Sequence, residues 1–210
     1  MTIEIALIVL LVFLGLITAL ILAIAIQKAN NARLKYKHGA ARDYLMKRYF
    51  DHEKVKLPVS SRFFFNAFYE VETQIQIEPE IRDEIIKDLM VSNYYHYQVK
   101  RLQHPSHYVR RMAVYYIGSL RHPEAMKLLE KQFYIEKNDS VRFFLLYHLV
   151  ESMDQSMFDY LIKTLRYNRS KYPTWVFALI KNHFNRLKPF ILPYWDSKDK
   201  NVEELFIYLA

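Results

Sequence analysis

The chain has 210 residues, of which 52% are hydrophobic and 16% aromatic, so it can bury a core and is not globally disordered. The absence of cysteine excludes disulfides and thiolate metal sites, and three glycines are too few for glycine-rich phosphate-binding loops. The net charge of +8 is concentrated, because residues 28–56 carry nine Lys and Arg against three Asp and Glu.

The first predicted element is a helix that crosses a membrane. Residues 5–26 are an apolar run of 22 residues whose only polar member is Thr18. A helix of this length spans about 33 Å, slightly more than the roughly 30 Å hydrocarbon core of a bilayer. A cleaved signal peptide is the alternative, since Ala23-Ile24-Ala25 resembles a cleavage site. The run is too long for one and no basic residue precedes it, so we expect residues 1–27 to be a permanent anchor.

Positive charge follows the anchor directly, in the segment 28–56. The basic residues within about 20 residues of the anchor are Lys28, Arg33, Lys35, Lys37, Arg42, Lys47 and Arg48. Such charge stays on the cytoplasmic side, so we expect a single-pass protein with its amino terminus outside and the rest in the cytoplasm. Topology alone explains these side chains. A second interpretation is that they also bind anionic headgroups, with residues 32–50 lying along the bilayer surface as a helix broken near Gly39.

Helical segments continue from residue 57. Ser60 is a candidate N-cap, and the apolar stripe of a first helix is formed by Phe64, Ala67, Phe68 and Val71. Glu78-Pro79-Glu80 opens a second helix, with proline in its first turn. Residues 93–97 either continue this helix or interrupt it, and the sequence leaves both possibilities open.

A pair of helices then recurs with a spacing of 32 residues. The first stripe is Val109, Met112, Ala113, Tyr116 and Ile117, and its copy is Val141, Phe144, Leu145, His148 and Leu149. The helix that follows repeats as well, with Ala125, Leu128, Leu129 and Phe133 matched by Met157, Tyr160, Leu161 and Leu165. Two helices that repeat together predict an all-α fold in which the anchor is followed by a short α-solenoid of antiparallel helix pairs, over residues 57–210.

Two less regular copies complete the predicted repeats. A third stripe consists of Val176, Leu179, Ile180, His183 and Phe184, and a short helix is expected over 189–195. A fourth consists of Val202, Leu205, Phe206, Leu209 and Ala210. Because this last stripe has no capping signal, we expect the repeat domain to be incomplete at its carboxyl end.

The repeat region resembles the HEAT-type, armadillo-like helical repeats. The resemblance rests on Asp139-Ser140-Val141-Arg142 and on the related Tyr108-Val109-Arg110. In such repeats the valine packs in the core, and Asp and Arg of neighbouring repeats form a ladder of hydrogen bonds. The resemblance therefore implies structural roles for Val109, Arg110, Asp139, Val141 and Arg142. The first copy departs from the pattern, because His107 stands where Asp is expected.

The resemblance implies a non-enzymatic scaffold or adaptor that presents a repeat surface to a protein partner at the bilayer. Bacterial membrane-anchored proteins similar to this one accompany membrane glycosyltransferases. HEAT-like enzymes, such as lyases and DNA glycosylases, are one alternative, but no residues here indicate their chemistry. Nucleic-acid binding is another, and it depends on a basic stripe in the repeats. The candidates for this stripe, which glutamates interrupt, are Arg110, Arg111, Arg121, Lys127, Lys131, Arg166, Arg169 and Lys171.

Histidines and aromatic residues are the remaining candidates for sites. His148 and His183 share one column of the aligned stripes, so we expect both to pack with a bonded polar tip rather than to catalyse. His104 and His107 flank a turn, without a cysteine or acid that would complete a metal site, and we expect no metal or cofactor. Tyr115 and Phe143 lie beside the stripes, which makes them candidates for an exposed partner surface.

Overall fold

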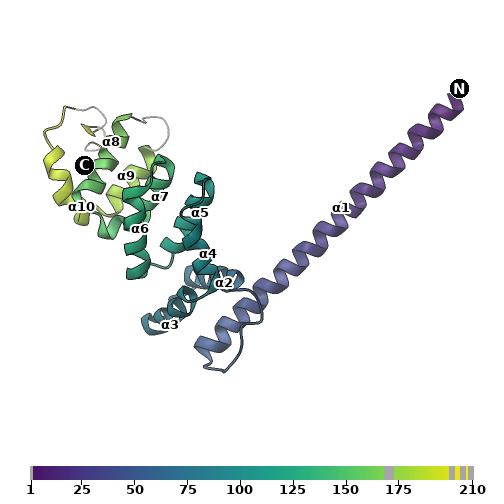
Figure 1. The fold of residues 1–210 in the computed structure, drawn as a ribbon, viewed down its shortest axis with the longest axis horizontal. Coiled ribbons are helices and arrows are strands. Elements are labelled where there is room, and N and C mark those ends of the chain that lie inside the picture. Colours follow the sequence, from purple (N-terminus) through teal and green to yellow (C-terminus); the bar gives the residue numbers. More distant parts are fainter. Residues whose placement is uncertain (1, 168–172, 199–201, 204–206, 208–210) are drawn as a thin grey trace. The chain divides into compact units, whose positions relative to one another are not determined.

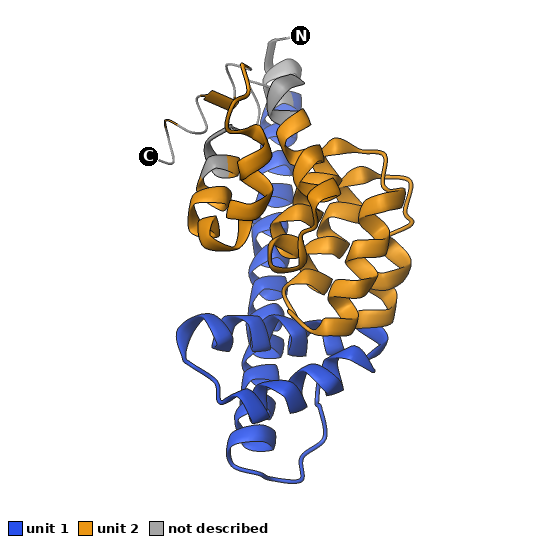
Figure 2. Cartoon of the chain, turned by 90° about the vertical axis from the view of Figure 1, so that its left-hand side faces the viewer, with its two compact units in different colours: residues 1–94 blue, residues 95–210 orange. Residues whose placement is uncertain are grey.

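The computed structural model describes residues 2–167, 173–198, 202–203 and 207, and every regular element among them is a helix (Figure 1). The chain forms two compact units, residues 1–94 and 95–210 (Figure 2). Unit 1 contains the predicted anchor, the basic segment and the first two helices of the globular part. The prediction of an all-helical protein with one long apolar amino-terminal helix is confirmed.

Unit 1 begins with α1, a single helix over Thr2–Leu45 that is drawn in purple and blue in Figure 1. The predicted break near Gly39 is wrong. A glycine inside a helix costs only about 1 kcal/mol relative to alanine, and strong helix formers such as Ala41, Arg42 and Leu45 follow it. A π-helical turn over Met46–Phe50 ends the helix.

The core of unit 1 forms where the end of α1 packs on α2 (Ser61–Gln74) and the π-helical turn packs on α3 (Pro79–Met90). The predicted stripe of α2 is buried, and α3 begins at its proline as predicted. Leu45 and Tyr49 are at most 1% exposed, and the Tyr49 ring stacks on Phe64 with centroids 6.0 Å apart. Neither residue can therefore lie on a bilayer surface, which corrects that interpretation of residues 32–50.

After a turn at residues 91–92, α4 (Asn93–Arg101) starts as a separate helix, so residues 93–97 do not continue α3. Unit 2 then contains α5 (His107–Gly118), α6 (Pro123–Ile135), α7 (Asp139–Leu149) and α8 (Gln155–Tyr167). Both α5 and α7, and likewise α6 and α8, begin 32 residues apart, the spacing that the sequence predicted. Side chains cap three of these helices: His122 accepts from the Glu124 amide, Asn138 from the Val141 amide, and Asp154 from the Met157 amide.

The remaining elements are α9 (Pro173–Asn182), α10 (Phe184–Ile191) and a 3₁₀ turn over Leu192–Tyr194. Val176, Leu179 and Ile180 are buried as predicted, but the stripe stops there, because α9 ends before His183 and Phe184 opens α10. The short helix expected over 189–195 thus begins at Phe184. Of the fourth stripe, Val202 is buried, and the others lie outside the described residues: Leu205, Phe206, Leu209 and Ala210.

Candidate interaction surfaces

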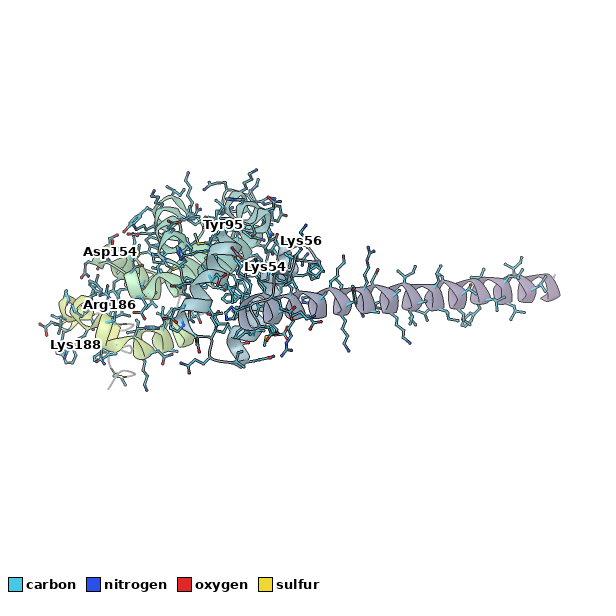
Figure 3. The ribbon with its side chains drawn as sticks, turned by 90° about the horizontal axis from the view of Figure 1, so that it is seen from below. Lys54, Lys56, Tyr95, Asp154, Arg186 and Lys188 are labelled. Carbon is cyan, nitrogen blue, oxygen red and sulfur yellow. The ribbon has the colours of Figure 1, made fainter. Side chains whose placement is uncertain are left out.

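The apolar part of α1 is uncovered along its length. The described large apolar side chains between Leu7 and Ile26 are 45–65% exposed, and Figure 3 shows side chains leaving this part of the helix on both sides. The Thr18 hydroxyl donates to the carbonyls of Leu14 (2.8 Å) and Gly15 (2.9 Å), so its donor is satisfied within the helix. By length and composition α1 can cross a membrane.

Three of the seven basic residues contact other parts of unit 1. The Lys37 ammonium lies 5.4 Å from the centre of the Phe63 ring. Arg42 is 3.9 Å from a carboxylate oxygen of Glu70, and Arg48 is 3.9 Å from one of Glu84. These pairs are exposed, so each contributes at most about 1 kcal/mol to stability. The remaining four basic side chains make no ion pair with the described residues: Lys28, Arg33, Lys35 and Lys47.

Just beyond the apolar run, the basic residues surround the helix instead of forming one face. At about 100° per residue, Lys28 and Lys35 share a face and Arg33 lies about 140° away. The exposed apolar residues Leu34 and Tyr36 lie on nearly opposite sides. A helix resting flat on a bilayer needs one apolar and one basic face, which this stretch does not have. A helix that rises through the headgroup layer, in contrast, presents cations to lipids on all sides.

The residues of the repeat signature lie in unit 2, where they do not form the ladder that the resemblance implied. Val141 is buried, whereas Val109 is half-buried. The Asp139 carboxylate accepts from the Tyr160 hydroxyl at 2.5 Å, and the Arg142 guanidinium lies 4.2 Å from the centre of the Tyr160 ring. In the described part of unit 2, Asp139 therefore pairs with no arginine.

Arg110, the remaining signature residue, makes a different ion pair. Its guanidinium donates from Nε and Nη2 to the two carboxylate oxygens of Glu136, both at 2.8 Å. Burial by itself raises the pKa of Glu136, but Arg110 and the amides of Lys137 and Asn138 outweigh it and hold the pKa below its usual value. The pair joins the start of α5 to the end of α6.

An aromatic cleft opens in unit 2, where α5 packs against α7. It has a volume of about 340 Å³ and is lined by Tyr115, Phe144, Tyr147 and His148. The Tyr147 and His148 rings meet edge to face with centroids 5.2 Å apart, and Tyr147 remains 58% exposed. The cleft is thus an apolar hollow with an accessible tyrosine at its edge.

His148 packs against Gly118 at the end of α5. A Cβ at position 118 would lie only 2.5 Å from Nδ1 of His148, so the ring occupies the space that a side chain would need. The Nε2 atom is buried and has no hydrogen-bond partner among the described residues. The expectation that the polar end of His148 is hydrogen-bonded is therefore wrong for this atom. Burial, assisted by the nearby charge of Arg121, lowers the pKa of His148 to about 4. The imidazole is therefore neutral at physiological pH.

Of the two aromatic residues predicted to form an exposed partner surface, one was correct. Tyr115 lines the cleft, whereas Phe143 is 1% exposed and belongs to the core, so it cannot offer a partner surface. Phe144 and Tyr147 are the lining residues that sequence reasoning missed. The 32-residue period contained the signal for Tyr147, which occupies the position in its repeat that Tyr115 occupies in the preceding one.

Two other histidines make polar contacts beside helix ends, His104 before α5 and His183 after α9. Nδ1 of His104 accepts from the Ser106 amide at 3.0 Å, and Nδ1 of His183 lies 2.9 Å from the Glu151 carboxylate. His183 thus differs from His148, because it lies beyond the end of α9 and pairs with an acid. Within the described ranges, no three His, Asp or Glu side chains come together as metal ligands.

Comparison with known proteins found no match: no family model, no curated protein and no solved structure is similar to this chain.

Proposed function

We propose that this protein is a membrane-tethered adaptor in which α1 crosses the bilayer and the helices after it bind a protein partner. The observation that supports this function is the course of α1. Its exposed apolar stretch, which ends at Ile26, continues as one helix into the core of unit 1, where Ala41 and Leu45 are fully buried. A membrane helix of this kind holds a folded unit at a fixed place beside the bilayer.

The proposed topology is a single pass with the amino terminus outside and both units in the cytoplasm. The seven basic residues nearest the apolar stretch all follow it, and residues 1–4 contain no Lys or Arg, which favours this orientation. We propose headgroup contact for the basic residues just beyond the apolar stretch, and not for a surface helix over residues 32–50. At 1.5 Å per residue, Lys28 rises about 3 Å and Arg33 about 10 Å beyond Ile26, within reach of a headgroup layer about 5–8 Å thick.

We further propose that α5 to α8 form the solenoid of helix pairs. The equal spacing of the helix starts supports this arrangement, and so does the burial at matching positions. Ala113 and Leu145, 32 residues apart, are both 0% exposed, and so are Ile117 and Leu149. A surface built from repeated helices is typical of proteins that bind other proteins along an extended face.

Nucleic-acid binding, the main alternative, is less well supported. Of the cations it would use, Arg110 is neutralised by Glu136 at 2.8 Å. Arg111 lies 4.8 Å from the centre of the Phe144 ring, beside a cleft with an apolar lining. Arg111, Arg121, Lys127 and Lys131 alternate along the chain with Glu124 and Glu130, so they do not form the continuous basic stripe that a phosphate backbone would follow. The side chains of Arg166, Arg169 and Lys171 lie outside the described residues.

The absence of cysteine makes the membrane proposal directly testable. Single cysteines at Thr2 and Asp196 can be probed in intact cells with a membrane-impermeant maleimide, and the same membranes can be washed with carbonate. We expect the protein to remain in the pellet and only the Thr2→Cys variant to react from outside. Release by carbonate would refute the anchor, and labelling of the Asp196→Cys variant in intact cells would refute the orientation.

A further inference from the structure

The aromatic cleft has a positive edge that the described part of unit 2 does not neutralise. No acidic residue lies in α5, and the Arg111 guanidinium rests 4.8 Å from the Phe144 ring centre with its Nε unbonded. Arg121 follows the end of α5 and is exposed. Neither arginine pairs with a carboxylate among the described residues.

The acids at the start of α7 and in the turn that follows it are already engaged. The Asp139 carboxylate accepts from the Tyr160 hydroxyl at 2.5 Å, and Glu151 lies 2.9 Å from Nδ1 of His183. The positive charge beside the cleft is therefore left for a ligand. An isolated cation, which aromatic rings often bind, would be repelled by the two arginines.

The lining also limits what can enter the cleft. Its surface is almost entirely apolar, and the Nε2 atom of His148 is covered, so the cleft offers few hydrogen bonds to a nucleobase edge. An apolar side chain would lose its contact with water against Tyr115, Phe144 and Tyr147 without leaving polar groups unpaired. Aromatic rings beside arginines are the residue types that most often dominate protein–protein binding.

We propose that the aromatic cleft binds an acidic segment of a protein partner, which inserts an apolar side chain among the rings and pairs its carboxylates with Arg111 and Arg121. This inference rests on the proposed adaptor function and names the chemistry of its partner.

Photocrosslinking in the native membrane tests the proposal. A benzophenone amino acid replaces Tyr147 in the full-length protein, and mass spectrometry identifies the crosslinked peptide. The matched control replaces Tyr134 on α6, which is 49% exposed and lies outside the cleft. We expect an adduct that forms only at position 147 and whose peptide has an apolar residue flanked by Asp or Glu. A basic peptide, a nucleic-acid adduct, a lipid adduct or no adduct would overturn the proposal.

A synthetic copy of the crosslinked peptide then gives the energetics with the full chain in detergent. We expect Tyr147→Ser to weaken binding by about 30-fold, as for a hot-spot residue, and Arg111→Gln with Arg121→Gln to weaken it and reduce its salt dependence. Lys127→Gln with Lys131→Gln removes the same charge from α6 and should leave binding unchanged. Equal losses from both double variants would overturn the role of the arginines.

The two proposals fail in distinguishable ways. Carbonate washing of the crosslinked membranes reports the anchor independently of the adduct. Protein that stays in the pellet but crosslinks to a basic peptide refutes only the cleft proposal, and protein released into the supernatant refutes the adaptor function. Tyr147 and Arg121 are exposed, so their variants should keep the wild-type circular dichroism and thermal transition.

Discussion

Replacing Gly118 with alanine tests how closely α5 and α7 pack. The new Cβ would lie 2.5 Å from Nδ1 and 2.7 Å from Cδ2 of His148, closer than side-chain carbons approach other atoms. Overpacking of this kind costs about 1–3 kcal/mol, whereas exchanging a helical glycine for alanine gains about 0.5–1 kcal/mol. We therefore expect Gly118→Ala to lower the free energy of unfolding by about 1–2 kcal/mol.

The same substitution should change sign when the imidazole is absent. In a His148→Ala background the Cβ has free space, so only the helix-propensity gain remains and Gly118→Ala should stabilise unit 2 by about 0.5–1 kcal/mol. Gly39→Ala is the matched control, since nothing lies within 4 Å of the position that its Cβ would take, and it should stabilise α1 by a similar amount.

Urea unfolding of the full chain in detergent measures these differences. Both tryptophans, at positions 175 and 195, belong to unit 2, so their fluorescence follows the unit that contains Gly118. Circular dichroism follows the Gly39 control. If Gly118→Ala stabilises the wild type, or destabilises the His148→Ala background as much as the wild type, then the His148 ring does not fill the space at Gly118 and the reasoning is refuted.

Three further predictions concern single contacts. Between pH 6.5 and the folded pKa of about 4, the unfolded chain binds a proton at His148 that the folded chain does not bind. The free energy of unfolding therefore falls as the pH is lowered, by about 2 kcal/mol at pH 5. Urea titrations at pH 7.5 and 5 should show this loss, and His148→Phe should remove it. Tyr49 donates to Asp88 at 2.6 Å, so Tyr49→Phe should cost about 1 kcal/mol in thermal unfolding, and Asp88→Asn, which keeps an acceptor, should cost less. Arg110→Met leaves Glu136 buried without its partner and should cost about 3–5 kcal/mol, and Arg110→Lys should restore only part of it, because lysine cannot donate two parallel hydrogen bonds; full recovery with lysine would count against the bidentate pair.

The positions of the helices could be predicted from local sequence signals. Proline at position 79 marks the start of α3, and the 32-residue period predicts the spacing of the helices from α5 to α8. The break expected near Gly39 failed for a local reason too. Composition changes from apolar to basic around residue 27, but backbone hydrogen bonding continues wherever the residues are good helix formers.

The interaction partners of side chains could be identified only from the tertiary structure. Arg110 and Glu136 are 26 residues apart, and the carboxylate comes from a residue just beyond α6, where no periodic pattern points to it. Phe143 was misplaced because a single stripe assumes that a helix packs on one side. α7 contacts α5, α6 and α8, so both Phe143 and Leu145 are buried although they point in different directions.

The unbroken course of α1 has a mechanical consequence. The helix has no break between Ile26 and Ala41. Rotation of the apolar stretch about its axis therefore rotates the core of unit 1 by the same angle. Adding one residue to this stretch would rotate unit 1 by about 100° and shift it by about 1.5 Å, whereas adding seven would nearly restore its orientation. The number of residues in α1 thus fixes the rotation of unit 1 about the helix axis.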